Sequence, residues 1–370
     1  FSGKLKMFSI ALIILGVLGI GIGFYNAPST VEEAMEMVSS DDHGDGHGGE
    51  TSHESTLKEE YSAGAHATKE SHKASQVHET VDAHASEHNE VSIDTHATDA
   101  HADEAAHGED HDTAHAEHVF HQLQNRPWSA VYVALLFFLG ITLLVLAFYA
   151  IQRVAQAGWS IVLFRVMEAI TYYVLPGGLI VLGIALWAGD HIFIWMDPEV
   201  VAHDELIQGK AGWLNKTWFA IRGLIFITGW SLYRYFSRKF SLAQDLADVN
   251  DNSNFKKNFR ISAAFLVFYI YTESIMSWDW IMSVDPHWFS TLFGWYVFAS
   301  MFVSGITVIA LITIYLKSKG LMEFVNDSHL HDLAKFMFAI SVFWTYLWFS
   351  QFMLIWYANI PEEVTYFVTR

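Results

Sequence analysis

Long apolar stretches alternate with polar connectors along this chain of 370 residues. A helix that crosses the roughly 30 Å hydrocarbon core of a bilayer needs about 20 predominantly apolar residues, and seven stretches meet that requirement. They cover approximately residues 7–25, 128–151, 161–187, 213–236, 261–282, 290–316 and 333–357. The pattern predicts an all-α polytopic membrane protein with seven spans that pack as a transmembrane helix bundle.

The spacing of these stretches predicts three parts: a transmembrane helix in residues 1–27, a loop in residues 28–127, and a bundle of six spans in residues 128–370. No small-x-small cleavage site follows the first stretch, so we expect a retained anchor and not a cleaved signal peptide. We expect this sequence to be trimmed at both ends. Because seven is an odd number of spans, we also expect further spans if the natural chain continues past Arg370.

Basic residues collect at alternate connectors, which predicts the orientation of the chain because Lys and Arg concentrate on the cytoplasmic side. They are Lys4, Lys6, Arg153, Arg234, Arg238, Lys239, Lys256, Lys257, Arg260, Lys317 and Lys319. We expect a cytoplasmic N-terminus, with residues 28–127, 188–212 and 285–289 on the opposite face.

The acidity of the chain belongs to one tract, residues 41–118. The formal net charge is -19, and this tract holds 20 of the 40 acidic residues, 14 of the 20 His and three Lys. Such a composition cannot bury a core, so we expect a disordered extracytoplasmic loop. Pairs such as His43 with His47 resemble metal ligands. A solvated tether with loose metal or proton buffering is the favoured interpretation, because a specific site needs fixed ligands.

Redox cofactors are not expected in this chain. It contains no Cys, which excludes Cys-ligated iron–sulfur clusters and thiolate catalysis. The His residues outside the tract fall at span ends or in loops, where they cannot face one another as haem ligands. We therefore predict no catalytic residue, no haem and no metal site.

Ionisable residues within spans are functional candidates, because a charge in hydrocarbon is costly. Arg165 and Glu168 share one helix face, and Arg222 and Glu273 lie inside the fourth and fifth predicted spans. We expect Arg222 to pair with Glu273 or Glu168. Structural stabilisation and proton conduction both predict such a pair.

The densest group of polar residues follows Glu273 and comprises Asp279, Asp285 and His287 among Trp and Met. This arrangement is typical of a proton relay or of a site that hydrogen-bonds a quinol headgroup. A capped helix end with a Pro-containing turn is the structural alternative. Upstream, Pro176-Gly-Gly interrupts the third span, either to line a cavity or for close packing.

Two segments are distinctive: Ser277-Trp-Asp-Trp-Ile-Met-Ser-Val-Asp-Pro-His-Trp-Phe-Ser-Thr-Leu-Phe-Gly-Trp-Tyr and Gln351-Phe-Met-Leu-Ile-Trp-Tyr-Ala-Asn-Ile-Pro-Glu-Glu. They resemble the F membrane subunit of bacterial alternative complex III, a quinol:cytochrome c oxidoreductase related to polysulfide-reductase membrane anchors. The resemblance covers most of residues 128–370. It implies a ten-span fold with two four-helix bundles, so three spans would follow Arg370.

The resemblance also implies partners in the bacterial inner membrane. They are a sister quinol-binding membrane subunit, an iron–sulfur periplasmic subunit, multihaem and monohaem cytochrome c subunits and, in some members, a terminal oxidase. Haem c and iron–sulfur clusters would belong to those partners. The F subunit would supply scaffold and proton pathways, with membrane lipids and no nucleic acid among its contacts. Glu168, Arg222, Glu273, Asp279, Asp285 and His287 are then the expected polar interior.

Two alternatives stay open. A structural anchor for periplasmic cytochromes would keep its turnover after Glu273→Gln and Asp279→Asn. A divalent-metal transporter is less favoured, because the polar residues within the spans are Arg, Glu and Asp and not His. Metal transport that is retained after deletion of residues 41–118 would favour it.

Overall fold

The computed structural model describes residues 3–42, 100–248, 250–359 and 364. Within these residues the regular secondary structure is helical, with no strand. The chain divides into two units, one formed by Phe1–Asn26 with Asn125–Arg370 and the other by Ala27–Gln124. Most of the predicted disordered tract, residues 43–99, lies outside the described residues.

The second unit contains α2 (Val31–Asp42) and the first part of α4 (Ala100–Val154). The prediction of an irregular loop over residues 28–127 is therefore wrong at both of its ends. Helix α2 begins at a reciprocal cap, in which the Ser29 backbone N–H donates to Glu33 Oε2 at 2.9 Å and the Glu33 N–H donates to Thr30 Oγ1 at 3.3 Å. Helix α4 begins in an Ala-rich and Glu-containing segment of high helix propensity.

Six helical segments of the described chain are long and apolar enough to cross a membrane. They are Lys6–Tyr25 in α1 (Gly3–Tyr25), Val119–Val154 in α4, Trp159–Trp187, Ser253–Val284, Phe293–Ser318 (α12) and Asp327–Ala358 (α13). These apolar helices indicate a multi-pass membrane protein. The prediction of an all-helical fold is confirmed for the described residues.

The predicted fourth span corresponds to α10 (Lys216–Asp245), which is not among the six segments. Its length of 30 residues is sufficient, but it carries Arg222 in its first half and Arg234 and Arg238 in its second. These charges lower its mean hydropathy. The seventh span thus stays a prediction.

The third predicted span consists of four short elements in succession. They are η1 (Trp159–Leu163), α5 (Phe164–Ile170), η2 (Thr171–Tyr173) and α6 (Val174–Trp187). The helix was predicted to be interrupted at Pro176-Gly-Gly, but the interruption lies in η2, just before these residues. Pro176 falls in the first turn of α6, where proline is tolerated. The two glycines serve close packing: a Cβ on Gly178 would lie 2.9 Å from Ile227 Cγ1 of α10.

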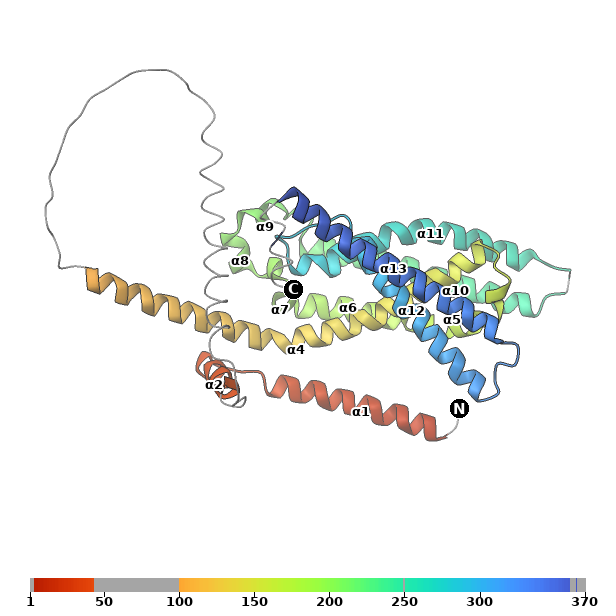
Figure 1. Ribbon diagram of the computed structural model, residues 1–370, viewed down its shortest axis with the longest axis horizontal. Helices are drawn as coiled ribbons and strands as arrows, with labels where there is room; N and C mark the ends of the chain where they lie inside the picture. Colours follow the sequence, from red (N-terminus) through yellow and green to blue (C-terminus); the bar gives the residue numbers. More distant parts are fainter. Residues whose placement is uncertain (1–2, 43–99, 249, 360–363, 365–370) are drawn as a thin grey trace, which may run out of the picture. The chain divides into compact units, whose positions relative to one another are not determined.

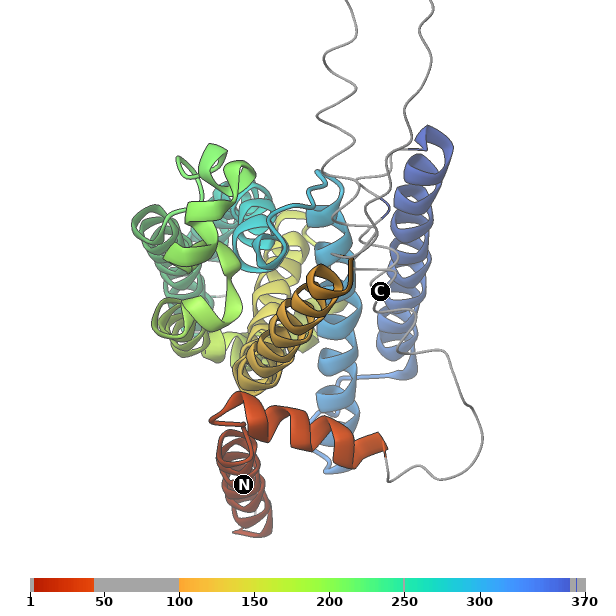
Figure 2. The ribbon, with the colours of Figure 1, turned by 90° about the vertical axis from the view of Figure 1, so that its left-hand side faces the viewer.

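Helix α10 lies antiparallel to α11 (Ser253–Trp280), as Figure 1 shows, and it also packs against α6. Helices α12 and α13 lie beside each other in both views (Figures 1 and 2). Small residues allow these helices to approach closely. A Cβ on Gly229 of α10 would lie 2.4 Å from the Phe268 ring of α11, and one on Gly305 of α12 would lie 2.9 Å from Leu144 of α4.

Short elements connect α6 to α10 and α11 to α12. The first connection contains α7 (Gly189–Ile192), η3 (Ile194–Met196), α8 (Pro198–His203) and α9 (Glu205–Gly209), and the second contains η4 (Met282–Val284). The connection between α10 and α11 lies at the opposite end of these antiparallel helices. The polar groups described below lie at both ends and along α11.

Candidate functional site

A group of polar side chains from α4, α5, α10 and α11 surrounds Glu168, and we call it the Glu168 cluster. It consists of Tyr149, Arg153, Arg165, Glu168, Ser237, Arg238, Ser241, Asp245 and Asn258. Glu168 itself is buried, with 4% of its surface exposed. It accepts hydrogen bonds from Arg165 Nη1 at 2.6 Å, from the Tyr149 hydroxyl at 3.2 Å and from Arg238 Nη1 at 3.4 Å. The carboxyl group of Glu168 is thus held by two guanidinium groups and one hydroxyl.

The Tyr149 hydroxyl links Glu168 to the neighbouring helices. Arg153 Nε donates to it at 3.0 Å and Asn258 Nδ2 donates to it at 3.4 Å. Asn258 in turn accepts from the Ser237 hydroxyl at 2.8 Å. The cluster is therefore one connected network that holds α4, α5, α10 and α11 together.

A second polar group lies near the other end of α10 and α11, around Asp279, and we call it the Asp279 cluster. The Asp279 side chain is fully buried, and Arg222 donates to it from Nε at 2.5 Å and from Nη2 at 3.1 Å. Trp213 Nε1 donates to Asp279 Oδ1 at 2.8 Å, and the Arg222 guanidinium lies 4.3 Å from the Trp213 ring centroid. The carboxylate is therefore ion-paired and hydrogen-bonded by two residues that come from outside its own helix.

Glu273 lies between the two clusters along α11 and differs from both Glu168 and Asp279. Its side chain is 4% exposed, and its Oε1 has no hydrogen-bond partner among the described residues. The hydroxyl of Tyr269, one turn earlier, is likewise buried without a partner there. Buried polar groups of this kind are ordinarily satisfied by ordered water, so this pair marks a place on α11 suited to hydration.

Several buried polar residues lie on one face of α11, with the apolar Phe265 between Ser262 and Tyr269. Asn258, Ser262, Tyr269, Glu273 and Ser277 are all buried, and their spacings of four and seven place them on one side of the helix. At 1.5 Å per residue, the distance along the axis from Asn258 to the level of the Asp279 cluster is about 30 Å, close to the thickness of a bilayer core. We call these five residues the α11 polar face.

Two loops are joined near the Asp279 cluster, and we call the contact between Asp204 and His287 the clasp. His287 Nε2 lies 2.6 Å from Asp204 Oδ2, and Lys210 Nζ donates to the Pro286 carbonyl at 2.6 Å. Partial burial opposes ionisation of Asp204, but the Ile207 N–H and the His287 ring outweigh it, and the pKa of Asp204 lies below its ordinary value. The segment from Asp204 to Trp213 is thus fixed at one end by His287 and reaches Asp279 at the other.

The six sequence-predicted candidates therefore do not form one site. Glu168, Asp279 and Glu273 lie at three levels of the bundle, and the predicted pairing of Arg222 with Glu273 or Glu168 is wrong, because Arg222 pairs with Asp279. Asp285, with 58% of its side chain exposed, and His287 lie in the surface loop. Burial and helix register separate residues that stand close together in the sequence.

Several residues of these groups were not singled out from the sequence. Trp213 is one of them, and its indole N–H donates to Asp279. Neither Asn258 nor Ser262 is unusual by itself. Together with Tyr269 and Glu273, however, they form a set of polar residues that repeats at helical spacing within one apolar helix. A search for polar residues along a single helix face would have found them.

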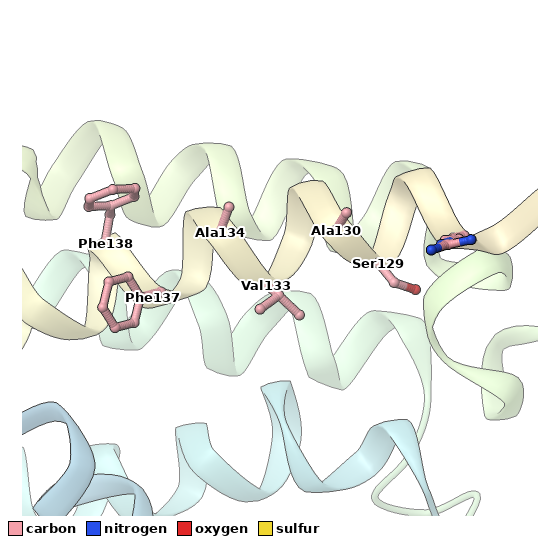
Figure 3. Close-up of a pocket in the computed structure, with 7 residues that line it drawn as sticks. Ser129, Ala130, Val133, Ala134, Phe137 and Phe138 are labelled. Atoms are coloured by element: carbon pink, nitrogen blue, oxygen red, sulfur yellow. The ribbon is translucent and has the colours of Figure 1, made fainter. Parts of the chain in front are cut away.

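A shallow groove follows one side of α4 and is lined by Arg126, Ser129, Ala130, Val133, Ala134, Phe137 and Phe138. Figure 3 shows these side chains in succession along the helix. The lining is apolar except at Arg126 and Ser129, which suits contact with hydrocarbon and offers no group for chemistry.

Among the described residues, no three His, Asp or Glu side chains come together as potential metal ligands. No protein-family model matches the chain, and no curated protein matches it.

Proposed function

We propose that this chain is a membrane subunit of a bacterial respiratory quinol:cytochrome c oxidoreductase, in which it serves as scaffold and carries a proton pathway. The resemblance of residues 277–296 and 351–363 to the F subunit of alternative complex III supports the family. The proposal includes a location in the inner membrane, α10 as a seventh span and, from the distribution of Lys and Arg, a cytoplasmic N-terminus. Haem c and iron–sulfur clusters would be held by the partner subunits.

The α11 polar face is the observation that carries the proton pathway. Hydroxyl, amide and carboxyl groups run along it from the Glu168 cluster towards the Asp279 cluster, and such groups exchange protons through hydrogen bonds and intervening water. Glu273 is the suited relay, because its carboxyl is buried and has no ion pair with any of the described residues that would fix its charge. The ion pairs at the two ends hold the helices in register around it.

The assignment to a respiratory complex is tested by affinity purification of the tagged full-length protein in mild detergent. Co-purification of haem c and iron–sulfur subunits with quinol:cytochrome c turnover is expected. A colourless protein that is isolated alone and shows no turnover would contradict the assignment.

The proton pathway is tested in the purified complex after reconstitution into liposomes with an internal pH indicator. Glu273→Gln removes the titratable group with little change of shape, so proton translocation per electron should fall while electron transfer to cytochrome c persists. Glu323→Gln, which changes an exposed carboxyl between α12 and α13, is the matched control. Unchanged translocation in Glu273→Gln would favour the structural anchor.

A further inference from the structure

Arginine side chains outnumber carboxylates around the Glu168 cluster. Arg153, Arg165 and Arg238 belong to it, and Arg234 lies one turn before Arg238 on the same face of α10. The carboxylates that face these four cations are Glu168 and Asp245, and Arg165 contacts both of them. Two positive charges are therefore left without a counter-charge in this part of the bundle.

Arg234 is the residue where this excess is concentrated. Among the described residues it makes no ion pair with a carboxylate, and its Nε is buried without a hydrogen-bond partner. Its neighbour Arg238 acts on it as a like charge and reaches Glu168 only at 3.4 Å. Two guanidinium groups one helical turn apart, each with donors to spare, match the oxygen atoms of a phosphate group.

An exposed apolar strip begins at this pair. The Arg234 guanidinium lies 4.9 Å from the ring centroid of Tyr172, which is 69% exposed. Leu175 and Leu179 follow at three and seven residues on the same side of the broken third span, and both are exposed. An anion that binds at Arg234 would therefore have an apolar surface beside it.

We propose that Arg234 and Arg238 bind the phosphate group of an anionic phospholipid whose acyl chain lies along Tyr172, Leu175 and Leu179. Two guanidinium groups could bind the phosphate of a lipid or a free phosphate ion. The adjoining apolar strip favours the lipid, because it would contact an acyl chain. Basic pockets between transmembrane helices bind anionic headgroups for the same reason. The proposal does not depend on the respiratory function, since it concerns only the surface of α6 and α10.

The site is tested with the full-length protein, stripped of lipid in detergent and titrated with phosphatidylglycerol or phosphatidylcholine under native mass spectrometry. The wild type should bind phosphatidylglycerol about tenfold more tightly than phosphatidylcholine, because the choline ammonium beside the shared phosphate is repelled by the two guanidinium groups. Arg234→Gln should lose most of this preference. Lys239→Gln, which removes one positive charge from an exposed position of the same helix, should retain it.

Three results would overturn the proposal. They are equal binding of the two lipids by the wild type, equal loss of preference in Arg234→Gln and Lys239→Gln, and complete displacement of phosphatidylglycerol by millimolar inorganic phosphate, which would identify a free anion as the ligand. If Arg234→Gln fails to fold, the comparison of phosphatidylglycerol with phosphatidylcholine binding by the wild type still tests the proposal.

Discussion

Two carboxylates on α11, six residues apart, have opposite surroundings. Asp279 is fully buried, and both of its oxygens accept hydrogen bonds from Arg222 or Trp213. Glu273 is almost as buried, yet one of its oxygens has no partner in the described structure. Because a buried ion pair is costly to break and an unpaired carboxyl is costly to charge, Asp279 is suited to fix structure and Glu273 to exchange a proton.

Removal of the Asp279 carboxylate should destabilise the bundle. Asp279→Ala leaves Arg222, whose side chain is 13% exposed, as an uncompensated buried charge, which costs about 3–5 kcal/mol. Thermal unfolding in detergent measures the loss. Asp285→Ala, at an exposed position, should change stability by less than about 1 kcal/mol. The double variant Asp279→Leu with Arg222→Met should recover most of the loss, and failure to recover would show that the ion pair is not its cause.

At the scale of the element, the glycines of α6 determine how closely it approaches α10. A Cβ on Gly178 would meet Ile227 at 2.9 Å, and one on Gly223 of α10 would meet Leu182 at 2.8 Å. By contrast, a Cβ on Gly183 would meet nothing within 4 Å. The two helices are thus packed through reciprocal contacts of a glycine with an aliphatic side chain.

Gly178→Ala should therefore separate α6 from α10 and destabilise the protein by about 1–3 kcal/mol, the usual effect of overpacking. Gly183→Ala on the same helix should be neutral or stabilising by up to about 1 kcal/mol, because it only restricts the backbone. Thermal unfolding of both variants in the same detergent distinguishes the effects. Equal stability of the two would mean that the Gly178 contact does not limit the packing.

The clasp between Asp204 and His287 should respond to pH. Since the pKa of Asp204 is lowered in the folded protein, its carboxylate stabilises the clasp above the ordinary carboxyl pKa, and this contribution is lost as the pH falls through the lowered value. Asp204→Asn keeps a helix-capping side chain but removes the charge. At pH 7 it should weaken the clasp by no more than about 1 kcal/mol, because His287 is half exposed.

Hydrogen exchange of the backbone amides in residues 205–213, corrected for intrinsic rates, measures this effect. The difference between Asp204→Asn and the wild type should be present at pH 7 and should disappear as the pH falls through the lowered pKa of Asp204. Glu205→Gln changes an adjacent exposed carboxyl and is the control. A difference that persists at the lowest pH would mean that the charge of Asp204 does not hold the clasp.

At the scale of the whole molecule, the decisive element is α10. It packs between α6 and α11, and its ends hold Arg222 in the Asp279 cluster and Arg238 in the Glu168 cluster. Two of the three arginines that reduce its apolar character, Arg222 and Arg238, are turned to buried carboxylates. If the neighbouring helices cross the membrane, α10 must cross with them.

The absence of Cys from the chain makes this testable by labelling. Glu205→Cys and Asp248→Cys lie on the two sides of α10, and Glu323→Cys lies between α12 and α13. In intact cells, a membrane-impermeant maleimide should label Glu205→Cys and spare the other two until the cells are opened. Labelling of Glu205→Cys and Asp248→Cys from the same side would exclude α10 as a span.

How far the sequence predicts the site depends on the range of the interaction. The position of Arg165 and Glu168 on one helix face was expected from their spacing of three, and the two side chains form an ion pair at 2.6 Å. The pairing of Arg222 with Asp279 joins residues 57 positions apart and was not expected. Local geometry follows from helical periodicity, whereas the contact between two helices depends on their register, which no single-chain pattern specifies.

The sequence by itself determined the helical architecture and most of the apolar segments, because hydrocarbon length and backbone hydrogen bonding leave few alternatives. It also determined which residue types are costly to bury. Only the tertiary structure decided that Trp213 and Arg222 hold Asp279, that Glu273 stands apart, and that Arg234 is left without a carboxylate. The physical reason is that these outcomes depend on how helices distant in sequence are rotated and shifted against each other, and side-chain packing across the whole bundle sets that arrangement.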